Sequence, residues 1–224
     1  MTHSTERRFM HAARPRLERR GEGEDAPHVI VGYAAVFYRA DEPGTEYQLW
    51  SDAYERIMPG AFDAALDEKD VVRALTNHDS NWLLGRSDQG TLRLSVDTVG
   101  LRYEIDPPDT QAGRDTVTLL YREDLDGSSF GFRVYGKRGR VQWVEETRDA
   151  RTVEVREIHD CELIDVGPVT FPAYTATEAG VRSEDLPAHL VEARSDWQRW
   201  RADRRDIGRE LDLKIAIDYA CATD

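Results

Sequence analysis

The sequence predicts a strand-dominated α+β domain built around a barrel-like or highly curved sheet. Runs rich in β-branched and aromatic residues recur along most of the chain. Two of these runs, at residues 91–96 and 101–105, alternate cleanly between apolar and polar side chains and are separated by a short turn, which is typical of a hairpin. Only a few segments between the strands have helical spacing. This mixture favours an α+β architecture.

The strands can be placed in order from their composition and from the turn residues between them. The first opens the domain at His28, and a turn containing Asp41, Pro43 and Gly44 separates it from the second. Strands are expected at residues 28–37, 47–50, 71–75, 91–96, 101–105, 130–135, 141–145 and 151–166.

Two helices are expected among these strands. Residues 59–66 carry a proline in the first turn and would bury Phe62, Ala65 and Leu66. In residues 110–122, apolar side chains recur at the helical spacing of Val117, Leu120 and Tyr121.

The two ends of the chain differ in character from the middle. Residues 1–27 are polar and charged and predict a flexible N-terminal arm, and residues 28–182 form the predicted domain. Residues 183–224 predict a charged amphipathic helical region, which could pack on the domain or bind a partner. Its apolar positions are Leu190, Trp197, Trp200, Ile207, Leu211 and Ile215.

Composition narrows the class of protein. The chain has 224 residues, 40% of them hydrophobic, and a formal net charge of −13, which argues against a nucleic-acid-binding protein. Cys161 and Cys221 lack metal-ligand spacing, and we expect free thiols in a reducing compartment. There is no signal-peptide pattern and no apolar run of about 20 residues, so we expect a soluble intracellular protein that is neither secreted nor membrane-bound.

Three segments could supply a base, a nucleophile and an acid. His78 follows an apolar strand and is the best placed of the six histidines for a role as base. Ser128 and Ser129 stand between Gly127 and Gly131, which would let a substrate approach the backbone. On an extended chain the two serines face opposite sides, so only one of them could meet His78.

The acidic member is expected on the strand at residues 151–166. His159 and Asp165 would share one face of it, about 20 Å apart at about 3.3 Å per residue, so they could not both contact His78. Asp165 lies between Ile164 and Val166, where a carboxylate needs a partner. We therefore prefer Asp165 and keep His159 as a minor candidate.

At these residues the chain resembles the prohead, or procapsid, maturation serine proteases of tailed phages. The resemblance extends from about Gly32 to Arg182. The matching blocks are Gly32–Phe37, Pro59–Phe62, Asn77–Asp79, Leu84–Arg86, Gly90–Leu94, Ser129–Phe132 and Pro168–Tyr174.

The resemblance implies a small herpesvirus-protease-like β-barrel surrounded by helices, with no cofactor and no metal. It also implies His78 as general base, Ser129 as nucleophile and Asp165 as third member. Relatives commonly have glutamate, valine and serine where this chain has Asp165, Val166 and Gly167, whereas the viral relatives of the fold use a second histidine. Ser128 stands where methionine is usual.

The function implied by the resemblance is cleavage of scaffold protein, or of the scaffolding segment of the major capsid protein, and of the protease itself. The protein would then act in the host cytoplasm, inside the assembling procapsid of a phage or prophage, and a homodimer is plausible. Two other classes stay open. The His-Asp pairs at 78–79 and 159–160 suggest a metal-dependent phosphohydrolase. The arm and the charged C-terminal region suggest a non-catalytic assembly or scaffold protein.

Overall fold

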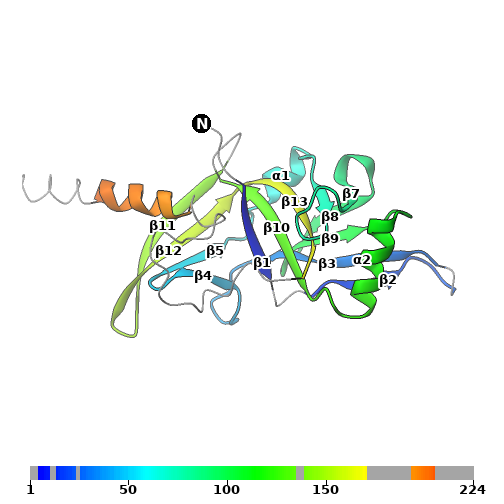
Figure 1. Cartoon of the computed structure of the whole chain (residues 1–224). Helices are drawn as coiled ribbons and strands as arrows, with labels where there is room; N and C mark the ends of the chain where they lie inside the picture. Colours follow the sequence, from blue (N-terminus) through cyan, green and yellow to red (C-terminus); the bar gives the residue numbers. More distant parts are fainter. Residues whose placement is uncertain (1–4, 11–13, 24–25, 135–138, 171–192, 205–224) are drawn as a thin grey trace, which may run out of the picture. The chain divides into compact units, whose positions relative to one another are not determined.

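A computed structural model of the chain describes residues 5–10, 14–23, 26–134, 139–170 and 193–204. By its contacts the chain divides into two units, Met1–Val181 and Arg182–Asp224. Strands dominate the first unit, as the sequence predicts (Figure 1).

The strands of the described residues pair into three open sheets. A five-stranded sheet has the order β1-β10-β13-β6-β7, and two four-stranded sheets have the orders β11-β12-β5-β4 and β2-β3-β9-β8. We call the last two the β12 sheet and the β3 sheet. The expected closed barrel is not confirmed and stays a prediction.

The bounds of the strands are β1 Glu6–Met10, β2 Arg16–Arg19, β3 His28–Val36, β4 Glu46–Trp50, β5 Ala53–Ile57, β6 Arg73–Leu75, β7 Leu83–Arg86, β8 Leu92–Val96, β9 Gly100–Ile105, β10 Gly127–Arg133, β11 Arg140–Arg148, β12 Arg151–Asp160 and β13 Glu162–Val169.

The helical elements of this unit are short. They are α1 (Asp63–Asp67), α2 (Gln111–Tyr121) and the 3-10 turn η1 (Ser87–Gln89). The hydroxyl of Thr110 accepts a hydrogen bond from the N–H of Gly113 at 3.2 Å and so caps α2. Tyr121 is exposed rather than buried, because Thr116 and Leu120 form the inward face of this helix.

The prediction of one strand over residues 151–166 is wrong. The structure breaks the run at Cys161 into β12 and β13, which belong to different sheets. Buried side chains alternate at Arg156 and Ile158 and again from Cys161 to Asp165, but Cys161 comes three residues after Ile158, so the alternation changes phase at the break. The residues on both sides belong to the same core. Because a bulge within one strand also shifts the phase, the pattern did not show that the chain changes sheet.

The prediction of a flexible arm over residues 1–27 is also wrong for two of its segments. Glu6–Met10 is β1 and pairs antiparallel with β10, and Arg16–Arg19 is β2 and pairs antiparallel with β3. Both strands are rich in charged residues, and a mostly charged segment does not show the apolar signal of a strand.

An aromatic cluster lies at the centre of the core. The rings of Phe62 and Phe130 meet edge to face at 5.6 Å between centroids, and Phe130 stacks on Phe132 at 4.9 Å. All three side chains are fully buried. Because Phe130 and Phe132 belong to β10, this strand is anchored in the core on the side opposite to Ser129.

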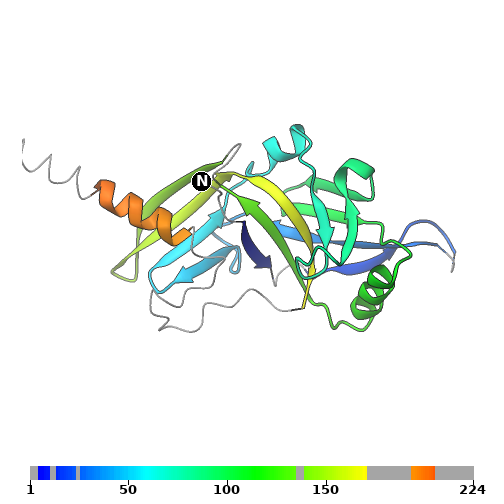
Figure 2. The same ribbon diagram turned by 45° about the horizontal axis from the view of Figure 1, so that its top comes forward.

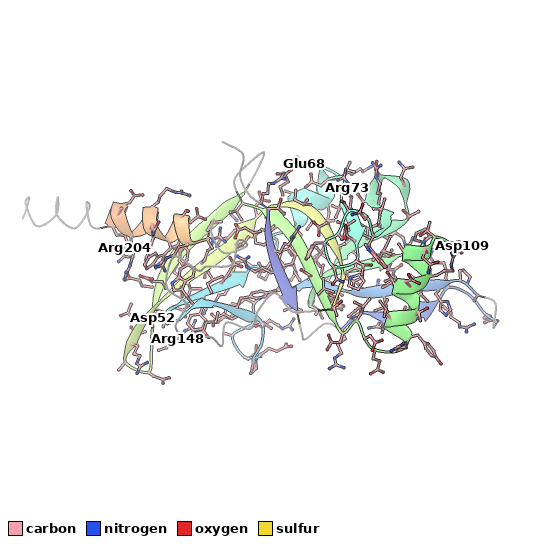
Figure 3. All side chains as sticks on the ribbon, viewed as in Figure 1. Asp52, Glu68, Arg73, Asp109, Arg148 and Arg204 are labelled. Carbon is pink, nitrogen blue, oxygen red and sulfur yellow. The ribbon has the colours of Figure 1, made fainter. Side chains whose placement is uncertain are left out.

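Charged side chains are spread over the elements of the fold, and six of them are labelled in Figure 3. Arg148, labelled in Figure 3, ends β11 and binds Glu46 and Glu146, which also bind Arg56. Among the described residues, no helix is long and apolar enough to cross a membrane.

In the second unit the structure describes a helix at residues 193–204. Within it the guanidinium groups of Arg194 and Arg201 lie over the ring of Trp197, at 4.1 and 4.7 Å from its centroid. The rest of the predicted amphipathic region lies outside the described residues.

Candidate active site

The fold brings His78, Ser129 and Asp165 together. The Oγ atom of Ser129 lies 2.6 Å from Nε2 of His78, and Nδ1 of the same imidazole is hydrogen-bonded to Oδ1 of Asp165. Ser129 and Asp165 are 2% and 5% exposed, so water has little access to either side chain. The three groups form a hydrogen-bonded series of hydroxyl, imidazole and carboxylate.

Pairing of β10 with β13 places the serine and the carboxylate. In the antiparallel register Ser129 is opposite Gly167, and Gly131 is opposite Asp165. Because side chains two residues apart share a face, Ser129 and Asp165 lie diagonally on the same face of the sheet. His78 then needs to reach only one spot on that face.

Two glycines make room at this diagonal. A Cβ atom at Gly131 would come 2.6 Å from Oδ2 of Asp165, so the glycine leaves space for the carboxylate. At Gly167, φ is +156°, and a Cβ would come 2.0 Å from the carbonyl oxygen of Leu75. The absence of a side chain at 167 therefore lets β13 pack against the end of β6.

His78 is presented by a loop in an uncommon backbone conformation. Asn77 and His78 have φ angles of 55° and 57°, in the left-handed region that Asn and His tolerate better than most residues. Asn77 holds this loop to the end of β13. Its side chain donates to Oγ1 of Thr170 at 3.0 Å and accepts from the N–H of Thr170 at 2.8 Å, while its own N–H donates to the carbonyl of Pro168 at 3.0 Å.

Strain at a site residue persists only when the surroundings enforce it. Here the enforcing groups belong to the same strand that carries Asp165. The loop and the carboxylate therefore share one support, which keeps the distance between His78 and Asp165 short.

Ser128 points away from these three residues. Its hydroxyl is hydrogen-bonded to the hydroxyl of Tyr103 at 2.8 Å, on the opposite side of β10. Burial raises the pKa of Tyr103 well above its ordinary value, so its hydroxyl stays protonated. This arrangement agrees with the expectation that only one of the two serines could meet His78.

His159 is not brought to the site. It lies on β12, in the β12 sheet, and its Nε2 is 3.2 Å from Oε2 of Glu157 on the same strand. Among the residues that the structure describes, no group of three or more His, Cys, Asp or Glu side chains could hold a metal ion.

One contact at the site was not expected from the sequence. The hydroxyl of Ser129 donates a hydrogen bond to the backbone carbonyl of Arg8 at 2.8 Å, from β1. No local signal in the sequence indicated it, because Glu6, Arg7 and Arg8 are all charged and the usual signal of a strand is apolar. Only the structure shows that the first and third of these side chains are buried and the second is exposed.

A serine, an imidazole and a carboxylate in hydrogen-bonded series are the arrangement that serine hydrolases of unrelated folds share. The model of one family, the caudovirus prohead serine proteases, matches residues 16–191 of this chain. The chain belongs to that family, whose members are phage capsid-maturation proteases. Neither the curated proteins nor the solved structures contain a match.

Proposed function

We propose that this protein is a serine endopeptidase in which Ser129 is the nucleophile, His78 the general base and Asp165 the residue that orients the imidazole. The observation that carries the proposal is the hydrogen-bonded series from Ser129 through His78 to Asp165. A neutral imidazole that donates from Nδ1 to the carboxylate presents a bare Nε2 to the serine, which is the form that a general base needs.

The reaction is an acyl transfer in two steps. Ser129 Oγ attacks the carbonyl carbon of the substrate while His78 takes the hydroxyl proton, and the proton then passes to the amine that leaves as the C–N bond breaks. Water repeats the sequence on the ester and frees the serine. Asp165 stabilises the imidazolium that forms in each step and stays ionised.

The substrates that we propose follow from the family. They are the scaffold protein or the scaffolding segment of the major capsid protein, and the protease itself, inside the assembling procapsid in the host cytoplasm. Self-association as a homodimer belongs to the same proposal. We expect neither a cofactor nor nucleic acid to take part.

The hydrogen bonds of His78 argue against the alternative of a metal-dependent phosphohydrolase. Both ring nitrogens of this residue are engaged, Nδ1 by Asp165 and Nε2 by Ser129. A metal ligand would need one of these nitrogens free. The hydrogen bonds therefore favour proton transfer over metal binding at this residue.

The test is Ser129→Ala in the full chain, with Ser128→Ala as the matched control from the same strand. We expect Ser129→Ala to abolish both cleavage of scaffold and labelling by a serine-directed fluorophosphonate probe. Ser128→Ala should keep both, because its hydroxyl faces Tyr103. Undiminished cleavage by Ser129→Ala would exclude the assignment, and folded protein that never labels would favour the non-catalytic scaffold protein.

A further inference from the structure

β1 is an edge strand laid directly beside the strand that carries Ser129. It pairs antiparallel with β10, with Arg8 opposite Phe130 and Phe9 opposite Ser129 (Figures 1 and 2). Peptides commonly bind proteins by adding such a strand to the edge of a sheet. Without β1, β10 would itself be the edge strand and could accept a peptide in the same place.

The contact between β1 and Ser129 has a chemical consequence. The serine hydroxyl carries one proton and faces two acceptors, the carbonyl of Arg8 at 2.8 Å and Nε2 of His78 at 2.6 Å. While the proton is directed to the Arg8 carbonyl, it is not in position for transfer to His78. β1 therefore competes with the base for the proton that the reaction has to move.

The Arg8 side chain is buried against a carboxylate of β5. Its guanidinium is hydrogen-bonded to both carboxylate oxygens of Glu55, through Nε and, at 2.9 Å, through Nη2. The group also lies over the ring of Phe132, 5.3 Å from its centroid. Arg8 is 4% and Glu55 0% exposed, so this is a bidentate pair shielded from water.

Two residues earlier on β1, Glu6 forms an ion pair with an arginine of the domain. Its carboxylate binds Arg156 of β12 at 2.7 and 3.0 Å, and both side chains are fully buried. Arg7, between Glu6 and Arg8, is exposed. β1 thus presents an acidic and a basic side chain, with one residue between them, to a buried pair of the reverse charges, Arg156 and Glu55.

The charges of this buried pair are balanced without β1. Arg156 Nη1 also binds Glu55 Oε2 at 2.7 Å, so the two body residues keep each other's charge paired if the strand leaves. The match to the family begins at residue 16, and β1 lies before it. Both observations indicate that the domain can fold without β1 in this position.

We propose that β1 occupies the protease's own substrate groove. The groove would then select peptides with an acidic residue, one further residue and an arginine, and would present the bond that follows the arginine to Ser129. Glu55 would recognise the arginine and Arg156 the acidic residue. The inference rests on the proposed function, because it takes Ser129 as the nucleophile. β1 must leave before scaffold can be cleaved.

The first experiment measures access to Ser129. In Arg8→Glu the new carboxylate faces Glu55, and β1 should detach. We expect fluorophosphonate labelling to be at least about tenfold faster than in wild-type protein, because breaking a buried charge pair costs several powers of ten in affinity. Arg7→Glu makes the same change of charge at an exposed position of the same strand and should label at the wild-type rate.

The outcomes separate the two proposals. Equal Ser129-dependent labelling in wild type, Arg7→Glu and Arg8→Glu overturns the inference and leaves the proposed function standing. No labelling in any folded variant overturns the proposed function, and the inference with it. If circular dichroism shows that Arg8→Glu does not fold, Arg8→Met is used instead, because methionine replaces the guanidinium with an apolar side chain of similar length. The expected results are the same.

The second experiment measures specificity with a capped peptide of residues 5–10, Thr-Glu-Arg-Arg-Phe-Met. In the Arg8→Glu protein we expect cleavage after the second arginine, located by mass spectrometry and absent from a variant that also carries Ser129→Ala. A peptide with citrulline in place of that arginine should be cleaved at least about tenfold more slowly. Equal rates, or cleavage at another bond, would overturn the assignment of Glu55.

Discussion

At the scale of single residues, the proposed mechanism needs Asp165 to set the tautomer of His78. A carboxylate that accepts from Nδ1 leaves Nε2 bare for Ser129, whereas a neutral amide at 165 could donate to Nδ1 and stabilise the other tautomer. We expect Asp165→Asn to lower kcat for peptide cleavage by on the order of 10²- to 10⁴-fold. Thermal unfolding is the control, since a variant that loses activity only through unfolding would lose its folded signal as well.

Gly131 leaves space for the same carboxylate because it has no side chain. A Cβ there would come 2.6 Å from Oδ2 of Asp165, so Gly131→Ala should push the carboxylate away from His78. We expect kcat to fall with little change in KM, because the imidazole loses its orientation while the peptide groove is unchanged. Unchanged kcat in a folded Gly131→Ala variant would contradict this role for the glycine.

At the scale of elements, the loop after β6 holds His78 in a left-handed conformation only because Asn77 ties it to the end of β13. Asn77→Ala removes the two side-chain bonds to Thr170 and leaves alanine in a conformation that it adopts less readily. We expect a loss of kcat that exceeds what the loss of stability explains. The pH profile of kcat is the readout, because a misplaced base changes the profile and simple unfolding does not.

The elements also show what could be predicted from the sequence and why. The hairpin of β8 and β9 and the helix α2 were predicted with nearly correct bounds, because each is defined by local periodicity and a local turn or cap. The break at Cys161 between β12 and β13 was missed. The alternation changes phase between Ile158 and Cys161, but a bulge within one strand would do the same, so only the pairing partners show that the chain changes sheet.

At the scale of the whole molecule, Glu6, Arg8, Glu55 and Arg156 join three strands through charges buried in the interior. Each member leaves an uncompensated charge if its partner is removed. We expect Arg156→Met to lower the free energy of unfolding by about 3–5 kcal/mol, measured by urea denaturation. A loss below about 1 kcal/mol would show that the cluster relaxes or takes up water.

The same cluster predicts that the stability of the fold depends on pH. Burial alone would raise the pKa of Glu55, but Arg8 and Arg156 outweigh it and hold that pKa below its ordinary value. A carboxyl whose folded pKa is depressed stabilises the fold above its unfolded pKa, and this contribution is lost as the pH falls through the folded pKa. We expect stability to decrease as the pH falls below about 4.5, the ordinary value for glutamate.

The control for this pH dependence replaces both members of one pair. In Glu55→Gln with Arg8→Gln the two changes are neutral and leave Glu6 paired with Arg156. Urea denaturation between pH 7 and pH 3 should show a weaker loss of stability in this variant than in wild type. If the free energy of unfolding fell equally with pH in the variant and in wild type, other carboxylates would account for the acid sensitivity.

The sequence by itself determined the candidates for the site. His78 and Asp165 stood out by residue type and local setting, and the resemblance to a family chose Ser129 over Ser128. The tertiary structure decided which of these parts meet. Pairing of β10 with β13 set Asp165 beside the serine, the change of sheet at Cys161 left His159 on another strand, and β1 came to lie on Ser129. Strand pairing joins residues far apart in the chain, so no local pattern could show these contacts.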